Sequence, residues 1–391
     1  MKVLMINVVC GIRSTGRICT DLAAALESRG HEVRIAYGRE EVPEKYRKYA
    51  VRIGNNNDVN LHAVKARMLD ASGFGSKSAT LKFIRWVQAY DPDVIHLHNI
   101  HGYYINIEVL FEYLKTCNKK IIWTLHDCWP FTGHAAYCEA SGCERWITGC
   151  HDCPNIRDYP LSLVDRSKNN WARKKELFLN IPHMIIVTPS VWLADLVKKS
   201  FLEEYRVVTV HNGIDTSVFS KKKSDDQETN RKNNKKIVLG VAAKWDKRKG
   251  LDDFIKLSQL LSDEYQIVLV GVSDEEQKNL PETIRAIRRT NSTEELARLY
   301  SSAYVYVNPT YEDNYPTTNL EAIACGTPVI TYRTGGSPES AELYGCSVPK
   351  GAIKEIAEKI QGVESYKAPD ESAIAQIDVK AMVSKYLEYY Y

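Results

Sequence analysis

Residues 304–334, YVYVNPTYEDNYPTTNLEAIACGTPVITYRT, contain two strand-like runs separated by a loop and a helix. The runs at 304–310 and 328–334 are rich in β-branched and aromatic residues, which is typical of strands. Pro316 suits the first turn of a helix and Gly326 the position just past its end, so we predict a helix between them. A strand, a helix and a second strand in this order form the repeating unit of a parallel α/β sheet.

The same alternation of strand-like runs and amphipathic segments extends over the whole chain. A length of 391 residues fits two domains, at about 100–200 residues each. We therefore predict two α/β domains, each with a parallel sheet flanked by helices. The other predicted strands are 2–8, 31–38, 93–99, 120–127, 184–190 and 205–213 in the first half, and 236–242, 265–272 and 286–291 in the second.

A polar run, SKKKSDDQETNRKNNKK at 220–236, separates the two halves. It has no apolar periodicity and cannot bury enough surface to order itself, so we interpret it as a linker. The predicted organisation is a first domain at 1–218 with a cysteine-rich insertion at about 128–160, a linker at 219–236, a second domain at 237–372 and a C-terminal helix at 373–391. The spacing of Met382, Tyr386, Leu387 and Tyr390 favours packing of that helix on the first domain.

Composition restricts the class of protein. The apolar content of 44% and charged content of 26% are those of a globular protein. A net charge of +3, from 52 basic and 49 acidic residues, argues against a dedicated nucleic-acid binder. We find no secretion signal and no apolar stretch near the roughly 18 residues of a membrane span, so we expect a cytoplasmic protein.

Polar side chains follow the predicted strands, where open parallel sheets bind ligands. We expect the two sheets to face each other across a cleft lined by these residues. The candidates are Gly16, Arg17, His96, His98, Asn99, His101, His126, Asp127, Asn212 and Gly213 in the first half, and Lys244, Arg248, Lys249, Asn291, Asp313 and Glu321 in the second.

Two groups in the second half suggest binding of a phosphorylated ligand. Lys244, Arg248 and Lys249 lie within six residues and could hold a diphosphate, although a solvated loop has the same composition. Asp313 and Glu321 stand on either side of the predicted helix start, whose free N–H groups favour phosphate or sugar hydroxyls. The simpler alternative is that both carboxylates face water.

The histidines fall into two groups. His96 and His98 alternate onto one side of a strand, where neutral, hydrogen-bonded structural roles are favoured over a metal pair. His126 ends a buried strand beside Asp127, and for it we favour a functional role.

Four cysteines gather in HAAYCEASGCERWITGCHDCP, residues 134–154, with His134 and His151 nearby. Cys138, Cys143, Cys150 and Cys153 could close a tetrahedral zinc site that staples the insertion. Free thiols and a disulfide are the alternatives.

The motifs resemble those of the retaining glycosyltransferases of family 4. The stretch DNYPTTNLEAIACGTPV resembles their E-x7-E signature, and NGIDTSVF, KWDKRKG and NSTEELARLYSSAYVYVNPT are similar to family segments in the same order. WTLHDCWPFTGH with the following cysteines is similar to colanic-acid and capsule-type members. The resemblance covers nearly the whole chain and implies the GT-B fold of two Rossmann-like domains.

The resemblance implies a role for each candidate. Lys244, Arg248 and Lys249 would contact the donor diphosphate, and Glu321 would hold the ribose. Asp313 would meet the transferred sugar, with His126 near the reaction and Gly16 in a first loop that lets backbone approach the phosphate. The full candidate set is catalytic His126, Asp313 and Lys249; donor-binding Gly16, Arg17, Lys244, Arg248, Lys249, Asn291, Pro316, Thr317, Thr318 and Glu321; and acceptor-side His98, Asn99, His101 and Asp127.

The implied reaction moves a sugar, with retention and without a catalytic metal, from a UDP or GDP type donor to a saccharide or lipid-linked acceptor in surface polysaccharide synthesis. Peripheral contact with the inner membrane surface would follow. Two departures from the family pattern are Asp313 in place of Glu and Lys244 where many relatives have Arg. An epimerase or hydrolase of the same fold and a noncatalytic nucleotide-sugar-binding subunit stay open as alternatives.

Overall fold

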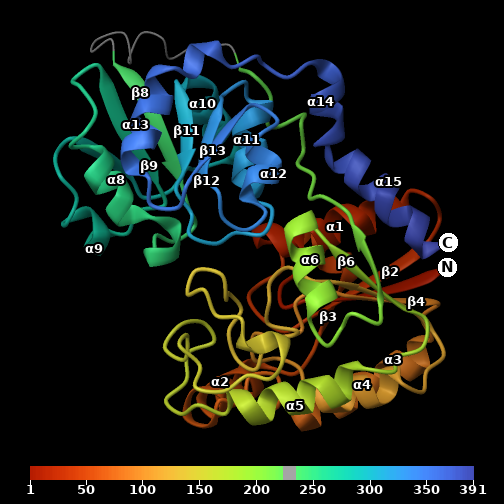
Figure 1. The fold of residues 1–391 in the computed structure, drawn as a ribbon. Helices are drawn as coiled ribbons and strands as arrows, with labels where there is room; N and C mark the ends of the chain where they lie inside the picture. Colours follow the sequence, from red (N-terminus) through yellow and green to blue (C-terminus); the bar gives the residue numbers. More distant parts are fainter. Residues whose placement is uncertain (223–234) are drawn as a thin grey trace. The chain divides into compact units, whose positions relative to one another are not determined.

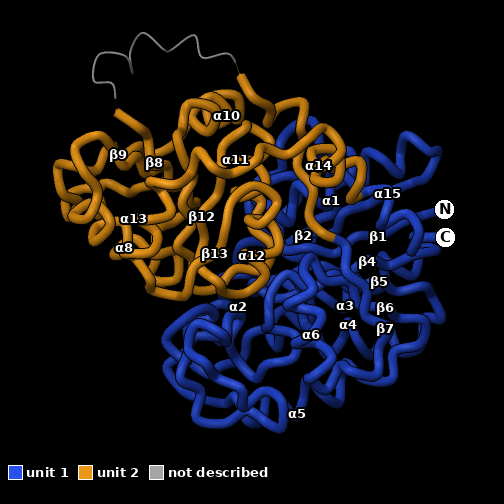
Figure 2. The backbone as a smooth tube through the Cα atoms, turned by 45° about the horizontal axis from the view of Figure 1, so that its top comes forward, with its two compact units in different colours: residues 1–210, 383–391 blue, residues 211–382 orange. Residues whose placement is uncertain are grey.

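The computed structural model describes residues 1–222 and 235–391 of the chain (Figure 1). Most of the predicted linker therefore lies outside the described residues. The chain divides into two compact units, shown in blue and orange in Figure 2: unit 1 is Met1–Val210 with Val383–Tyr391, and unit 2 is His211–Met382.

Unit 1 contains a seven-stranded parallel sheet in the order β3-β2-β1-β4-β5-β6-β7. Helices α3, α4 and α5 pack on one face of this sheet and α1 on the other (Figure 1). Its strands are β1 Lys2–Ile6, β2 Glu32–Tyr37, β3 Ala50–Arg52, β4 Val94–Leu97, β5 Lys120–Thr124, β6 Met184–Thr188 and β7 Arg206–Thr209. Its helices are α1 Arg13–Glu27, α2 Asn56–Leu69, α3 Lys77–Tyr90, α4 Ile107–Leu114, α5 Ser167–Phe178 and α6 Val191–Lys199, with short 3-10 turns η1 Glu44–Tyr49 and η2 Arg145–Ile147.

Unit 2 contains a six-stranded parallel sheet in the order β10-β9-β8-β11-β12-β13. Its strands are β8 Lys236–Val241, β9 Tyr265–Val270, β10 Ile284–Ile287, β11 Val305–Asn308, β12 Val329–Tyr332 and β13 Gly345–Val348. Its helical elements are η3 Lys247–Lys249, α8 Leu251–Leu257, α9 Asp274–Gln277, α10 Thr293–Ser302, α11 Thr317–Ala324, α12 Ser337–Ala341, α13 Ile353–Gln361, η4 Val363–Ser365 and α14 Glu371–Gln376.

The core of unit 2 shows why near-continuous apolar strands are needed. Val238 of β8 packs in a cluster with α8 and α13, whereas the next residue, Leu239, packs in a second cluster with α10 and α11. Successive side chains of a strand point to opposite faces, so a sheet covered by helices on both faces requires apolar residues at consecutive positions.

The predicted strand–helix–strand unit is confirmed as β11, α11 and β12. Pro316 is the N-cap of α11, and Gly326 follows its C-cap with a φ of +81°, a left-handed conformation that favours glycine. Two predictions need correction. The strand predicted at 286–291 is β10 at Ile284–Ile287, and the short strands β3 and β13 were not predicted, because their three or four residues carry little apolar periodicity.

The last helix, α15 (Val379–Tyr390), ends in unit 1. Tyr386 and Tyr390 are buried, and their hydroxyls contact Thr124 of β5 at 3.1 Å and His96 of β4 at 2.6 Å. Of the helices that the structure describes, none combines the length and apolar content needed to cross a bilayer.

Candidate active site

In unit 2, an ion pair stands beyond the carboxyl ends of β8 and β11. Lys249 Nζ lies 2.5 Å from Asp313 Oδ2, and each side chain is about one-fifth exposed, at 20% and 21%. Burial raises the pKa of Asp313, but the charges of Lys249 and Arg248 outweigh burial and hold this pKa below its usual value. The Asp313 carboxylate is therefore ionised at neutral pH, and both side chains of the pair are partly exposed.

Hydrogen bonds and a close glycine contact hold together the two loops that carry this pair. Arg248 Nη1 donates to the carbonyl of Glu312 at 2.8 Å, and the N–H of Tyr311 donates to the carbonyl of Arg248 at 2.7 Å. Gly250 has a φ of +74°, and a Cβ there would lie 2.3 Å from the carbonyl oxygen of Pro309. Only glycine permits this approach of the two loops.

A third loop, after β12, joins the same group. The N–H of Gly336 donates to the carbonyl of Asp313 at 3.0 Å, and Thr334 Oγ1 donates to the carbonyl of Thr310 at 2.6 Å. The loop at 333–336 was not predicted as part of the site. The paired Gly335 and Gly336 directly after a predicted strand were the signal that could have indicated it.

Helix α11 presents its N-terminus beside Asp313, with Thr317 and Thr318 as its first residues. Glu321, one turn further, is buried at 3% exposure, and the hydroxyl of Tyr300 donates to its Oε2 at 3.2 Å. The alternative in which Glu321 faces water is therefore wrong. Tyr300, which orients the carboxylate, was missed because its only sequence signal is a helical position in 293–302.

Two further donor-side candidates lie in loops that follow strands of unit 2. Lys244 is exposed in the loop after β8, next to Trp245, whose indole N–H donates to the carbonyl of Val270 at 3.0 Å. Asn291 follows β10, which β9 separates from β8, and its amide nitrogen donates to Glu295 Oε2 at 3.0 Å.

In unit 1, His96 lies within β4, His98 and His101 follow β4, and His126 follows β5; these histidines form two sets. His98 Nδ1 and His126 Nε2 are 3.1 Å apart with nearly parallel rings, and the rings of His96 and His98 are centred 4.0 Å apart. Burial lowers the pKa of His96 to about 3 and that of His126 to about 4, against the opposing charge of Asp127 on His126. These imidazoles are neutral at pH 7.

The second set pairs His101 with Asp127. His101 Nε2 lies 2.9 Å from Asp127 Oδ2, and His101 Nδ1 lies 3.0 Å from the hydroxyl of Tyr159. Burial raises the pKa of Asp127, but His101 and the N–H of Trp129 together lower it below its usual value. Asn99 lies nearby, with its N–H donating to Asn7 Oδ1 at 3.3 Å.

The predicted first loop needs a correction. Gly16 and Arg17 belong to α1, not to the loop after β1. The left-handed glycine of that loop is Gly11, with a φ of +74°. Gly16 is instead packed tightly, because a Cβ there would lie 3.1 Å from the backbone nitrogen of Gly11. Sequence alone did not distinguish a loop glycine from a helix-packing one. Asn212 and Gly213, predicted at the end of the first half, belong to unit 2.

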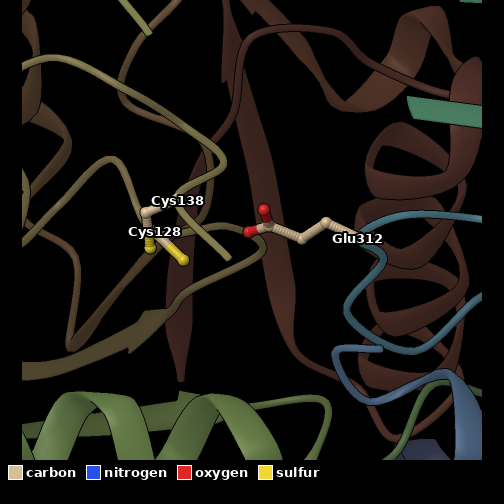
Figure 3. A group of neighbouring side chains, drawn as sticks. All are labelled: Cys128, Cys138 and Glu312. Atoms are coloured by element: carbon tan, nitrogen blue, oxygen red, sulfur yellow. The ribbon is translucent and has the colours of Figure 1, made fainter. Parts of the chain in front are cut away.

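The cysteine-rich insertion lies in unit 1, and no disulfide is assigned to any of the ten cysteines, all of which are among the described residues. No three of the thiols of Cys138, Cys143, Cys150 and Cys153 come within 4.8 Å of one another as a set. Cys138 Sγ lies within 4.8 Å of Cys128 Sγ (Figure 3, which also draws Glu312 of unit 2). Burial raises the pKa of Cys150 to about 11, and Cys138 and Cys143 are near enough to contribute to this rise.

Comparison with known proteins assigns the chain to a family. A model described as "Glycosyltransferase Family 4" matches residues 15–218, more than half of the chain, and one described as "Glycosyl transferases group 1" matches residues 222–376. The chain belongs to glycosyltransferase family 4. As a glycosyltransferase it is an enzyme, which favours sugar transfer over the epimerase, hydrolase and noncatalytic alternatives.

Individual relatives agree with this assignment. The putative colanic acid biosynthesis glycosyl transferase WcaC of Escherichia coli K12 is 25% identical over 374 residues, which cover 88% of this chain and 86% of that protein. A sucrose-phosphate synthase structure from Thermosynechococcus elongatus has a TM-score of 0.73 at 17% identity and covers 100% of this chain and 98% of its own. Anabaena HepE in complex with UDP has a TM-score of 0.68 at 14% identity, with 99% of each chain covered. These two likenesses show the predicted GT-B fold.

Proposed function

We propose that this glycosyltransferase moves a sugar, with retention of anomeric configuration, from a nucleotide-diphosphate sugar to a saccharide or lipid-linked saccharide in surface polysaccharide synthesis. The observation that carries the proposal is the accessible Lys249–Asp313 pair beside the start of α11. A cation, a carboxylate and free helix N–H groups at one place match the diphosphate and the sugar of one donor.

In the proposed reaction, unit 2 holds the donor. Lys249, with Arg248 and Lys244, stabilises the negative charge that develops on the departing diphosphate, and Thr317 and Thr318 offer backbone N–H groups. Asp313 accepts hydrogen bonds from the transferred sugar, while Glu321, held by Tyr300, binds the ribose. When the donor binds, the ion pair separates: Lys249 then contacts the diphosphate, and Asp313 contacts the transferred sugar.

Unit 1 is proposed to hold the acceptor. His126 is neutral and hydrogen-bonded to His98, so it can orient a hydroxyl without introducing charge. The Asp127–His101 pair fixes the loop that follows His126. In this proposal the acceptor hydroxyl attacks on the face from which the diphosphate leaves, and a phosphate oxygen of the donor receives its proton. The protein itself forms no covalent bond with the sugar.

The donor is proposed to be of the UDP or GDP type, and the UDP-bound structural relative supports the former. The test is transfer from a panel of UDP and GDP sugars to saccharide acceptors, with the anomeric configuration of the product read by NMR. Retention supports the proposal, and inversion contradicts it. Turnover is expected to persist in EDTA, because Lys and Arg replace a divalent cation. Activity that returns only with magnesium would contradict metal-independent catalysis.

A structural zinc in the insertion remains a separate proposal. The N–H of Gly133 donates to Cys150 Sγ at 3.2 Å. Cys138 and Cys143 contribute to the raised pKa of Cys150, and Cys143 and Cys150 contribute to that of Cys153. Their present separation means that the loops must draw together around the ion. Elemental analysis is expected to find about one zinc per chain, lost in the Cys150→Ser/Cys153→Ser variant. Wild-type protein without zinc would contradict this.

A further inference from the structure

Asp253, in the first turn of α8, is a buried carboxylate without a role in the reaction proposed above. Its side chain is 3% exposed, whereas that of the preceding residue, Asp252, is exposed. Both acids lie at the helix start, where negative charge is favourable, so the helix start alone does not explain why one of them is buried. A buried carboxylate needs hydrogen-bond donors in place of the water around it. Its burial therefore points to specific partners.

Two tyrosine hydroxyls supply these donors, and they meet at one oxygen of Asp253. The hydroxyl of Tyr311 donates to Asp253 Oδ2 at 2.8 Å, and that of Tyr332 donates to the same oxygen at 2.9 Å. Burial and the contact with Asp253 raise the pKa of Tyr311 to about 12 and raise the pKa of Tyr332 as well. Both hydroxyls therefore keep their protons at neutral pH and act as the donors.

The two tyrosines are packed together as well as hydrogen-bonded. Their rings meet edge to face, with centroids 5.6 Å apart and planes at 79°. They come from neighbouring strands, since β11 pairs with β12 (Figure 1). The other oxygen of Asp253 has a weaker partner, because Lys256 Nζ lies 3.4 Å from Oδ1 and the Lys256 side chain is 61% exposed. An ion pair with an exposed lysine contributes little to stability, so the tyrosines are the partners that hold the carboxylate.

Asp253 and the two tyrosines belong to the three segments that build the Lys249–Asp313 pair. Asp253 lies four positions after Lys249, and Tyr311 lies two positions before Asp313. Tyr332 ends β12 and leads into the loop that donates an N–H to the carbonyl of Asp313 at 3.0 Å. One carboxylate oxygen therefore joins the segment of the cation, the segment of the anion and the loop that supports the anion.

We propose that Asp253 is a positioning residue for sugar transfer, because its carboxylate fixes the loop of Asp313 relative to Lys249. It sets the places of the two charged groups that hold the donor, without touching donor or acceptor itself. Loss of this link displaces Asp313 from the reacting sugar, and a displacement of about 1 Å can slow a reaction about 10²-fold. The inference rests on the proposed function of the Lys249–Asp313 pair and adds that its geometry depends on a group outside the pair.

The test is steady-state kinetics of the full chain, with the donor that gives the fastest transfer in the panel of UDP and GDP sugars. Turnover is expressed per folded enzyme, with the folded fraction taken from urea unfolding at the assay temperature. Asp253→Ala is expected to lower kcat/KM about tenfold or more, and Tyr311→Phe/Tyr332→Phe should reproduce most of that loss. Asp253→Asn keeps an oxygen that accepts both hydroxyls, so its kcat/KM should lie within about threefold of wild type.

A matched control and a second background separate positioning from a general loss of stability. Asp252→Asn removes the exposed acid of the same helix turn and should leave kcat/KM unchanged. In an Asp313→Ala background, where no carboxylate is left to place, Asp253→Ala should lower kcat/KM by less than about threefold further. A residue that only stabilises the fold would show the same loss in both backgrounds.

Three results would overturn the inference. They are near-normal kcat/KM in Asp253→Ala, an equal loss in Asp253→Ala and Asp253→Asn, and an undiminished loss in the Asp313→Ala background. If Asp253→Ala does not fold, the double tyrosine variant takes its place in each comparison. Each of these results requires a wild type that transfers sugar, so each leaves the proposed function standing. A wild type that transfers no sugar from any donor of the panel would instead reject the proposed function, and the inference with it.

Discussion

The candidate residues of the two units lie at or beyond the carboxyl ends of parallel strands, but one group is charged and the other is neutral. Unit 2 presents charge, in the Lys249–Asp313 pair held by three interlocked loops. Unit 1 presents the neutral imidazoles of His96, His98 and His126, whose pKa values are lowered by burial. A charged, accessible edge suits a diphosphate, whereas a neutral edge suits hydroxyl groups. The difference supports the proposal that unit 2 holds the donor and unit 1 the acceptor.

The largest effect is expected from Lys249→Ala, which removes the cation of the charged edge. The loss of one preorganised group that stabilises the leaving diphosphate is expected to lower kcat/KM by roughly 10²-fold or more. Lys247→Ala, in the same short turn but exposed, is the matched control and should stay near wild type. Steady-state kinetics with saturating acceptor measure both. A near-normal kcat/KM for Lys249→Ala would place the diphosphate elsewhere.

The buried imidazole of His96 in unit 1 predicts that the free energy of unfolding depends on pH. His96 is neutral when folded and faces His98, Tyr386 and Tyr390. Its pKa of about 3 lies below the ordinary value of 6.5, so the unfolded chain binds a proton that the folded chain does not. Stability from this residue is present above about pH 6.5 and declines as the pH falls toward 3.

At pH 5 the loss should be about 2 kcal/mol relative to pH 7.5. Urea unfolding at pH 7.5 and pH 5 measures the free energy of unfolding at each pH. In His96→Gln, the difference between the two values is expected to be smaller than in wild type by this amount. Thr124→Val removes a hydrogen-bond partner of His96 but keeps the imidazole, so it should retain the wild-type pH dependence. An unchanged pH dependence in His96→Gln would refute the neutral assignment.

Glu321 and Asp313, the two candidate carboxylates of unit 2, are expected to affect different kinetic constants. Glu321→Gln is expected to raise the KM for the donor about tenfold with little change in kcat, because it loses contacts with bound ribose. Asp313→Asn is expected to lower kcat about tenfold instead, since its proposed contacts are with the reacting sugar. Tyr300→Phe, which removes only the hydroxyl that holds Glu321, should reproduce a weaker form of the first effect. Equal and minor effects in both carboxylate variants would reject the division of roles.

Sequence predicted the fold well where the signal is local. Pro316 and Gly326 mark the ends of α11, and near-continuous apolar runs mark the long parallel strands. The residues of the site were also indicated by their position after strands. Their pairing was not, because Lys249 and Asp313 are 64 positions apart and meet only once β8 and β11 lie side by side.

Gly16 and Asn291, which sequence did not place correctly, also show that local patterns do not report contacts between distant elements. Gly11 and Gly16 are five positions apart, and only the backbone conformation reveals which one turns the loop and which one packs inside α1. Asn291 ends the predicted strand 286–291, but the observed strand β10 ends at Ile287 and is separated from β8 by β9. Periodicity reports burial along one element, whereas sheet order depends on contacts between distant elements.

The smallest effect is expected from Tyr390→Phe, which alters the neutral edge without removing an imidazole. The hydroxyl of Tyr390 is hydrogen-bonded to His96 Nδ1 at 2.6 Å, across 294 positions of sequence. Its loss should lower the free energy of unfolding by about 1 kcal/mol, since one buried hydrogen bond is lost while ring packing remains. Because His126 is two imidazoles away from Tyr390, kcat/KM should change less than about threefold. Tyr389→Phe, on the partly exposed neighbouring position, should change neither quantity. An order-of-magnitude fall in turnover at unchanged stability would show instead that His96, His98 and His126 act as one unit. Activity would then depend on single contacts in unit 1 as strongly as on the charged pair of unit 2.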